Sequence, residues 1–177
     1  MRIAVTGSAG TGKSTLVGQL GPRLGLPVVP EGMREYLERT GVNLHDLRPG
    51  GLQELVLGLW DDRLPHEEAP GFVADRCAVD FAAFWLFYRF HDAPRSDEYL
   101  ATWTRHAQRY DAVVLLPHGD IDLAADGIRS PNHLVQLHAQ LLIEGFLERM
   151  VSPDRVLRVP RGLGVDARTA WVLERLG

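Results

Sequence analysis

Short apolar runs alternate along the chain with longer segments in which apolar residues recur every three or four positions. The runs are typical of strands buried on both faces, and the longer periodicity is typical of helices with one apolar face. The runs predict strands at Ile3–Val5, Pro27–Pro30, Phe72–Ala74, Ala112–Leu116 and Val156–Val159. The periodic segments predict helices at Lys13–Leu24, Gly32–Arg39, Leu52–Leu64, Cys77–His91, Ser96–Arg109, Pro131–Met150 and Asp166–Leu176.

This alternation predicts an α/β fold, a five-stranded parallel sheet with helices on both faces. Ligands of such sheets bind at the carboxyl ends of the strands. We therefore expect the functional groups just after strands, at Gly7 onwards, at Glu31, at Asp75-Arg76 and after Leu116. No repeat or shift in composition marks a second domain, so we expect a single domain over residues 1–177 with a lid segment at about 118–131.

The loop between the first strand and the first helix, GSAGTGKST, fits the P-loop pattern of Gly, four residues and Gly-Lys-Ser. Glycines let the backbone turn several N–H groups towards one phosphate, and the following helix adds the positive end of its dipole. Lys13 can reach the terminal phosphates and the Ser14 hydroxyl can bind Mg²⁺. We expect ATP to bind at Gly7, Ser8, Ala9, Gly10, Thr11, Gly12, Lys13, Ser14 and Thr15.

One feature of the composition supports this interpretation. Lys13 is the only lysine among 19 lysine and arginine residues. A compact ammonium fits between phosphates where the wide, planar guanidinium of arginine does not. A lysine kept at this position therefore indicates a task that arginine does badly.

Composition and charge narrow the class of protein. With 45% hydrophobic and 24% charged residues, the 177-residue chain should be soluble and globular. A net charge of −4 with dispersed basic residues argues against a dedicated nucleic-acid or anionic-membrane surface. The lone Cys77 allows no intrachain disulfide, so we expect a reducing, cytoplasmic setting, and we expect neither a signal peptide nor a membrane span. The oligomeric state is left open, a homodimer included.

Asp75 and Arg76 follow the third predicted strand. Asp75 is placed like a Walker B aspartate, which holds Mg²⁺ opposite Ser14, and the alternative is an N-cap for the next helix. NTP hydrolases often have a carboxylate at the position of Arg76 to orient water. An arginine instead can neutralise charge on a phosphoryl group in transfer, or it can form an ordinary ion pair.

Three further residues are candidates for the acceptor site. Glu31, just past the second strand, can accept a proton from a substrate hydroxyl, or it can be an acidic first-turn residue of the next helix. Arg34 can bind an acceptor anion or pair with Glu38. Asp80 is expected to face the same pocket.

The segment after the fourth strand contains Asp126-Gly127-Ile128-Arg129. A loop that carries an arginine can close over a triphosphate, exclude water and stabilise the transition state, while the alternative is a solvated surface loop. Phe81, Phe84, Trp85 and Tyr88 fall at helical spacing and indicate core, although one or two of them can form the floor of an acceptor pocket. Cys77 is expected to be a small buried residue rather than a nucleophile.

Four motifs, GSAGTGKST, PEGMREYL, ADRCAVD and DGIRSPN, together resemble the small P-loop kinases of the nicotinamide riboside kinase and deoxynucleoside kinase type. The resemblance spans most of the chain, and it is strongest to predicted ATPase/kinase proteins grouped with nicotinamide riboside kinase domains. It implies that Glu31 is the base for the acceptor hydroxyl, that Asp75 serves Mg²⁺, that Arg76 contacts the transferring phosphoryl and that Arg129 belongs to a lid.

The sequence thus predicts an ATP- and Mg²⁺-dependent phosphotransferase acting on a hydroxyl of a small molecule. Lys13, Glu31, Arg76 and Arg129 would be catalytic, Ser14 and Asp75 would hold the metal, and Glu31, Arg34 and Asp80 would contact the acceptor. The alternatives are an NTP-dependent regulatory ATPase without an acceptor, and an inactive nucleotide-binding scaffold. A GTPase with the guanine-reading Asn-Lys-x-Asp motif is excluded, because that motif needs a second lysine.

Overall fold

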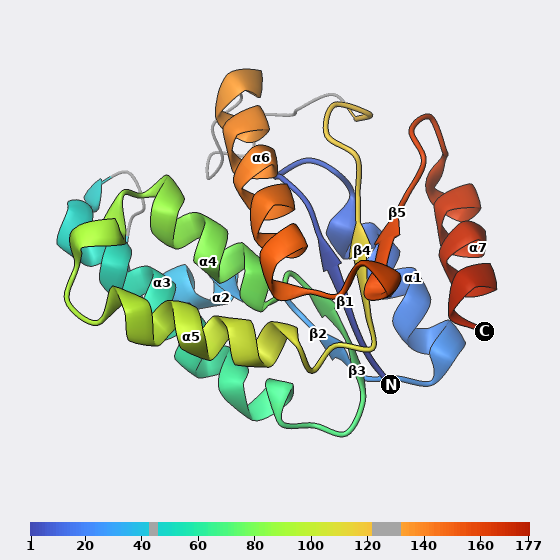
Figure 1. Ribbon diagram of the computed structural model, residues 1–177, viewed down its shortest axis with the longest axis horizontal. Helices are drawn as coiled ribbons and strands as arrows, with labels where there is room; N and C mark the ends of the chain where they lie inside the picture. Colours follow the sequence, from blue (N-terminus) through green and yellow to red (C-terminus); the bar gives the residue numbers. More distant parts are fainter. Residues whose placement is uncertain (43–45, 122–131) are drawn as a thin grey trace.

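The structure, a computed structural model, describes residues 1–42, 46–121 and 132–177 (Figure 1). These residues form a five-stranded parallel sheet with the strand order β2-β3-β1-β4-β5. The strands are β1 (Arg2–Thr6), β2 (Val28–Val29), β3 (Phe72–Asp75), β4 (Ala112–Leu115) and β5 (Val156–Arg158). Because β1 is central, the loop that follows it ends up between the ends of β3 and β4.

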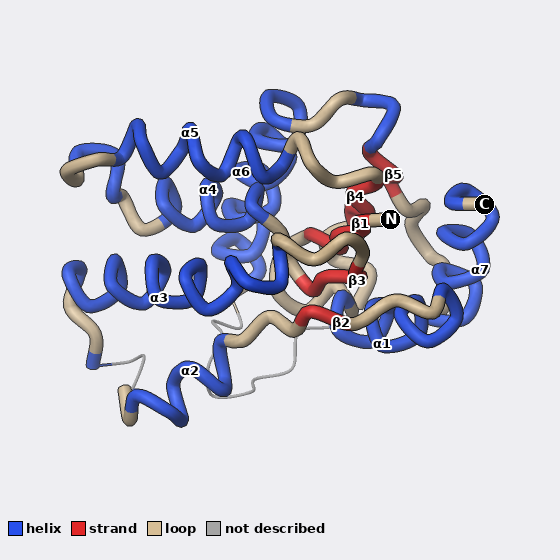
Figure 2. The backbone as a smooth tube through the Cα atoms, turned by 90° about the horizontal axis from the view of Figure 1, so that it is seen from below, coloured by secondary structure: helices blue, strands red, loops and turns tan. Residues whose placement is uncertain are grey.

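Helices cover both faces of this sheet, as the sequence predicts. One face carries α1 (Lys13–Leu24) and α7 (Val165–Leu176). The other carries α3 (Pro49–Glu67), α4 (Ala78–Phe87), α5 (Ser96–Ala107) and α6 (His133–Met150), and α2 (Met33–Thr40) lies beside α3. Figure 2 shows the strands between these two groups of helices.

The apolar strands supply two hydrophobic cores, one on each face. In β1, Ile3 and Val5 pack with the side chains of α1 and α7, while Ala4 between them belongs to the core under α3 to α6. Successive side chains of a strand point to opposite faces, so a strand that is apolar throughout fills both cores. All three of these residues are fully buried.

The predicted strands agree with the structure to within one or two residues, but two predicted helices were wrong at their ends. The helix expected at Leu52–Leu64 runs from Pro49 to Glu67, so it begins three residues earlier, ends three residues later and contains Pro65. The helix expected at Cys77–His91 stops at Phe87 and is followed by a separate 3₁₀ turn, η2 (Phe90–Asp92). Arg89 between them has a φ of 63°, a left-handed conformation that a helix does not continue through.

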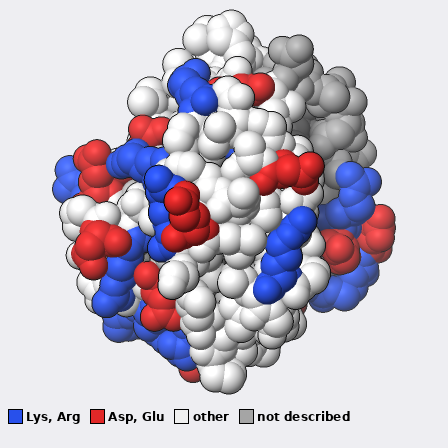
Figure 3. All heavy atoms as spheres, turned by 90° about the vertical axis from the view of Figure 1, so that its right-hand side faces the viewer, with Lys and Arg blue, Asp and Glu red and all other residues white. Residues whose placement is uncertain are grey.

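Charged side chains of both signs lie interspersed on the face of the molecule that carries α7 (Figure 3). None of the helices in the described part of the chain is long and apolar enough to cross a membrane.

Candidate functional site

The glycine-rich loop joins the end of β1 to the start of α1. Gly12 has a φ of 90° and directly precedes the first residue of the helix, Lys13. Gly7 has a φ of 140°, and a Cβ added there would lie 3.1 Å from the carbonyl oxygen of Leu116. Positive φ and close packing both favour glycine, so the loop takes the tight form that exposes N–H groups at a helix N-terminus. Such an N-terminus is an anion site.

Lys13 folds back over this loop. Its Nζ donates hydrogen bonds to the carbonyl oxygens of Gly7 at 2.9 Å and Ser8 at 2.8 Å, and the residue is only 5% exposed. Burial, followed by repulsion from Arg76, lowers the pKa of Lys13 to about 8, against the opposing attraction of Asp75 and other carboxylates. The ammonium is therefore already desolvated beside the loop.

Ser14 and Asp75 lie opposite each other, in the arrangement that the sequence predicted for these two residues. Ser14 Oγ donates to Asp75 Oδ2 at 2.5 Å. Asp75 Oδ1 is buried and has no hydrogen-bond partner among the residues that the structure describes. A buried carboxylate oxygen normally has a partner, so this oxygen and the Ser14 hydroxyl are suited to Mg²⁺, which prefers oxygen ligands.

Other ligands would have to complete such a metal site. Within the described ranges, no group of three or more His, Cys, Asp or Glu side chains could hold a metal ion. Mg²⁺ at Ser14 and Asp75 would therefore need phosphate oxygens or water as well, which is its usual mode of binding beside nucleotides. The alternative for Asp75, an N-cap, is not what the structure shows, because the N-cap of α4 is Cys77.

Arg76 is the centre of a buried charge cluster. Its Nε donates to Glu31 Oε1 at 2.5 Å, its Nη1 donates to Asp80 Oδ1 at 2.9 Å, and its guanidinium lies 4.8 Å from the ring centroid of Phe84. Burial alone lowers the pKa of Arg76, but Glu31, Asp80 and Asp75 outweigh it and hold this pKa above its ordinary value. The guanidinium is therefore permanently charged, and two of its donors hold carboxylates.

Glu31 lies before α2 and is not part of its first turn. The N-cap of α2 is Gly32 and the acidic residue of its first turn is Glu35, so the alternative of a first-turn residue does not describe Glu31. Its side chain, 18% exposed, turns towards Arg76 and lines a cavity. In this position the Glu31 carboxylate can contact a molecule bound in the cavity.

Asp80 corrects the prediction that it faces the acceptor pocket. It is fully buried and does not line the cavity. Its Oδ2 accepts hydrogen bonds from the Thr6 hydroxyl at 2.8 Å and the Cys77 backbone N–H at 2.9 Å, while its Oδ1 binds Arg76. Asp80 thus caps the first turn of α4. Its other carboxylate oxygen orients Arg76.

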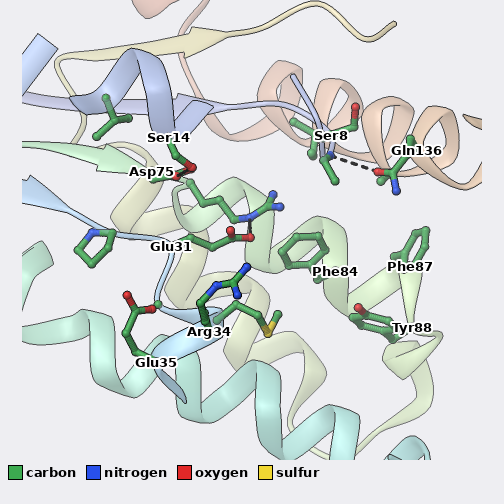
Figure 4. Close-up of a pocket in the computed structure, with 18 of the residues that line it drawn as sticks. Ser8, Ser14, Glu31, Arg34, Glu35, Asp75, Phe84, Phe87, Tyr88 and Gln136 are labelled. Atoms are coloured by element: carbon green, nitrogen blue, oxygen red, sulfur yellow. Dashed lines mark hydrogen bonds and ion pairs between the residues drawn. The ribbon is translucent and has the colours of Figure 1, made fainter. Parts of the chain in front are cut away.

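The cavity beside the loop has a volume of about 680 Å³. Figure 4 shows it between the Ser14–Asp75 pair, Glu31 and the aromatic side chains of α4. Arg34 and Glu35 of α2 lie at its edge. Its apolar lining comes from several elements and consists of Val17, Val28, Pro30, Met33, Leu52, Phe84, Phe87, Tyr88, Val135, Ala139 and Ile143. The volume is that of a small-molecule site.

The aromatic stripe of α4 is divided between core and cavity. Phe81 and Trp85 are buried in the core, whereas Phe84 and Tyr88 line the cavity. Burial raises the pKa of Tyr88, so it stays a neutral hydrogen-bonding group. Cys77 is buried as expected, and burial raises its pKa well above the ordinary value, which makes it a poor nucleophile.

Two residues of α6 contact the loop and were missed from the sequence. Gln140 Oε1 accepts a hydrogen bond from the Ser8 backbone N–H at 2.8 Å, and Gln136 Oε1 accepts one from the Ala9 N–H at 3.2 Å. Both glutamines are at least 95% buried. The sequence offered one hint of these contacts, a pair of glutamines four positions apart on a mostly apolar helix. The two hydrogen bonds fix α6 against the loop.

His118 also touches the loop, because its Nδ1 lies 3.1 Å from Ser8 Oγ. The predicted lid residues Asp126, Gly127, Ile128 and Arg129 lie outside the described residues.

The loop, Lys13, Ser14 and Asp75 on a parallel sheet of this strand order define the P-loop class of nucleoside-triphosphate-binding folds. The sequence profile of the family described as an AAA domain matches residues 2–161. The chain belongs to this family. A search of curated protein sequences finds no match.

Solved structures with similar folds are P-loop kinases. Deoxyadenosine kinase from M. mycoides, with dCMP and a flexible dCDP bound, is 17% identical with a TM-score of 0.72, and the match covers 99% of this chain and 98% of that one. The NadR protein in complex with NR is 20% identical with a TM-score of 0.75, covering 98% of this chain and 50% of that one. Thymidylate kinase from Candida albicans is 16% identical with a TM-score of 0.61, covering 97% and 88%. This chain therefore has the fold of the small P-loop kinases.

Proposed function

We propose that this protein transfers the γ-phosphoryl group of ATP to a hydroxyl of a small molecule, with Mg²⁺. The observation that carries the proposal is the position of Glu31. Its carboxylate lines a cavity large enough for a metabolite, next to the phosphate-binding loop and the Ser14–Asp75 pair. A nucleotide switch does not need a cavity that extends from the phosphate-binding loop to apolar and aromatic side chains in this way. The kinases with the same fold support the reaction class.

The proposed mechanism combines positioning with neutralisation of charge. Backbone N–H groups of the loop and Lys13 hold the β- and γ-phosphates. Ser14 and Asp75 would hold Mg²⁺, which neutralises phosphate charge when it is bound. The oxygen of the acceptor hydroxyl forms a bond to the γ-phosphorus, the bond to the bridging oxygen of ADP breaks, and Glu31 takes the hydroxyl proton.

The remaining site residues act on the transferred group and the acceptor. Arg76, held beside Glu31, neutralises charge on the phosphoryl group in transfer. Arg129, by its place in the sequence, would close over the triphosphate. Arg34 and the apolar wall from α4 contact the acceptor. Asp80 supports Arg76 rather than the acceptor.

The experiment that tests this proposal is a search for the acceptor. Nucleosides, sugars and amino alcohols are screened by thermal shift with ATP and Mg²⁺, because a true ligand stabilises the folded state by mass action. Compounds that raise Tm are then assayed for a phosphorylated product formed in equal amount to ADP. ATP consumption at the same slow rate across the whole panel would indicate a regulatory ATPase. ATP binding without any turnover would indicate an inactive scaffold.

Asp75→Asn should weaken the binding of Mg²⁺ by the protein. The amide oxygen can still accept from Ser14 Oγ, but the charge that attracts the cation is gone. We expect the apparent Mg²⁺ affinity in the presence of ATP to fall by about 10- to 100-fold, measured by titrating Mg²⁺ against turnover. The matched control is Asp111→Asn, because Asp111 binds the Arg2 backbone N–H at the opposite end of the sheet. Equal effects of the two changes would contradict a metal role.

ATP affinity should decrease as the pH rises through about 8, the pKa of Lys13 in the free protein. Phosphates favour the charged ammonium, so binding above this pH must first return a proton to Lys13, which weakens binding by up to about tenfold per pH unit. Calorimetry in buffers of different ionisation enthalpy should detect proton uptake, and Lys13→Ala should abolish it. A flat profile would contradict this role of Lys13.

The free energy of unfolding of the ligand-free protein should also depend on the protonation of Lys13, but it should increase with pH where the ATP affinity decreases. The unfolded chain keeps the Lys13 proton up to its ordinary pKa of 10.5, whereas the folded protein releases it near 8. The unfolded state then binds more protons between these values, so Lys13 contributes increasing stability as the pH rises from 8 towards 10.5.

A further inference from the structure

A buried polar network lies beneath the turn that carries Asp75 and Arg76. Arg63 and Glu67 of α3 are 4% and 3% exposed, and Tyr110, before β4, is fully buried. Arg63 Nε donates to Glu67 Oε1 at 2.7 Å, and the Tyr110 hydroxyl donates to the same oxygen at 3.0 Å. None of the three lines the cavity, and the proposed mechanism uses none of them.

Arg63 uses its remaining two nitrogens on the backbone of the turn. Nη1 donates to the carbonyl oxygen of Asp75 at 3.1 Å, and Nη2 donates to that of Arg76 at 2.5 Å. Only a planar guanidinium presents donors in this fixed fork, so a lysine could not hold both carbonyls and Glu67 together. Burial alone lowers the pKa of Arg63, but Tyr110 and Glu67 outweigh it, and this pKa lies above its ordinary value. The fork is thus permanently charged.

The turn needs this support because Arg76 has a strained backbone. Its φ of 71° lies in the left-handed region, which residues other than glycine rarely adopt. Such a residue persists only where its surroundings fix it from several sides. The Arg76 N–H donates to the Val5 carbonyl oxygen at 2.9 Å, and Arg63 holds its carbonyl. In this conformation the Arg76 side chain reaches Glu31.

The network also fixes the far side of the turn. The Ala78 backbone N–H donates to the Tyr110 hydroxyl oxygen at 3.0 Å. Arg63, Glu67 and Tyr110 therefore connect the carbonyls of residues 75 and 76 with the N–H of residue 78. Fold stability alone does not explain this arrangement well, since a buried ion pair is often no better for stability than packed apolar side chains.

We propose that Arg63, oriented by Glu67 and Tyr110, is a positioning residue that holds the Asp75–Arg76 turn in the conformation from which both side chains face the phosphate site. This inference rests on the proposed phosphotransfer, because it assigns Arg63 to the residues that would bind Mg²⁺ and the transferred group. Arg63 acts through the backbone of the turn and does not touch substrate.

The test variant is Arg63→Lys, which keeps the charge next to Glu67 but loses the fork. In the full chain, we expect kcat to fall by about 10- to 100-fold, a larger change than that of KM for ATP. The matched control is Arg109→Lys, because Arg109 pairs with Glu68 at the partly exposed surface nearby. It should leave kcat within about twofold of the wild type, as expected for an exposed pair.

A double-mutant cycle separates positioning from general destabilisation. In the Arg76→Ala background, the effect of Arg63→Lys on kcat should be at least about threefold smaller, since the side chain that it positions is absent. Equal effects in the two backgrounds, an unchanged kcat, or an equal loss in the Arg109 control would overturn the inference. If Arg63→Lys does not fold, Tyr110→Phe replaces it and should lower kcat about two- to fivefold with the same coupling.

A second readout keeps this inference separate from the proposed function. ATP affinity is measured with and without Mg²⁺, which requires no acceptor. Arg63→Lys should reduce the gain in affinity from Mg²⁺ by at least about threefold, because Asp75 shifts with the turn. If no acceptor is phosphorylated but this gain is lost, the proposed function fails and the positioning role stands. If transfer occurs and neither the gain nor kcat changes, only the positioning role fails. No ATP binding by the wild type would overturn both.

Discussion

Glu31→Gln should lower kcat by about 10²- to 10⁴-fold if the carboxylate accepts the proton of the acceptor hydroxyl. Glutamine has nearly the same shape, and its amide oxygen can still accept the hydrogen bond from Arg76 Nε. The change therefore removes the base and its charge but can keep the hydrogen bond to Arg76. KM for the acceptor should change far less than kcat, because the lost interaction belongs to the transition state. Steady-state kinetics with the acceptor found by the screen measure both.

The control for this prediction is Glu35→Gln. Glu35 lies one turn further along, at the edge of the same cavity. Glu35→Gln removes the same charge from the edge of the cavity and leaves the hydrogen bonds of Arg76 unchanged, so kcat should stay near that of the wild type. A near-normal rate for Glu31→Gln would reduce Glu31 to a counter-ion of Arg76, and the regulatory ATPase would become the better description.

Lys13→Ala should lower kcat by about 10²- to 10³-fold, the loss typical of removing one donor that stabilises transition-state charge. The fold should survive, because the change also relieves the burial of a charge whose pKa is lowered to about 8. Circular dichroism and Tm report the fold, and a phosphate-transfer assay reports the rate. Lys13→Arg should restore little activity, since the guanidinium does not fit where the Nζ now contacts Gly7 and Ser8.

A charge-matched control lies on the same helix. Arg23 is near the other end of α1 and contacts Gln19 at the surface. Arg23→Ala should leave turnover unchanged. Retained activity in Lys13→Ala would count heavily against phosphate transfer at this loop, because no other lysine exists in the sequence to take its place.

The parts of the fold that the sequence predicted are those set by local physical rules. Buried parallel strands are continuous apolar runs, so the strands were placed to within one or two residues. Helix α1 has the predicted bounds, because Gly25 ends it in a left-handed conformation, as glycine does in many helices. The order of the strands in the sheet was not predicted, since it depends on pairings between distant segments.

The errors in the helices came from tertiary contacts that override local preference. Pro65 suggested the end of a helix, because proline lacks an N–H for the helical ladder. The helix nevertheless continues to Glu67, which bonds Arg63 and Tyr110 in the core. The helix predicted at Cys77–His91 is interrupted at Arg89, which has a left-handed backbone conformation. Arginine rarely adopts this conformation, so no sign of the interruption was visible in the sequence.

The same distinction applies to the site. Glu31, Asp75 and Arg76 were predicted as site residues because each lies at or just after the end of a strand, and parallel strands bring their carboxyl ends to one edge. Asp80 was misplaced because its spacing from Asp75 did not show that it caps a buried helix turn. Gln136 and Gln140 are more than 120 positions from the loop they contact, so only the packing of α6 reveals them. The predicted roles themselves remain to be tested by the variants above.

The buried amine at position 13 has a practical consequence for chemical labelling. It is the only lysine side chain in the sequence, and near pH 8 a substantial fraction of it is neutral and therefore nucleophilic. A lysine-directed acylating reagent thus has one side-chain target, and its access is limited by the 5% exposure of that residue. The rate of acylation, followed by mass spectrometry of the peptide around residue 13, would report how often the loop opens. Occupancy by a triphosphate could then be followed as protection, without any knowledge of the acceptor.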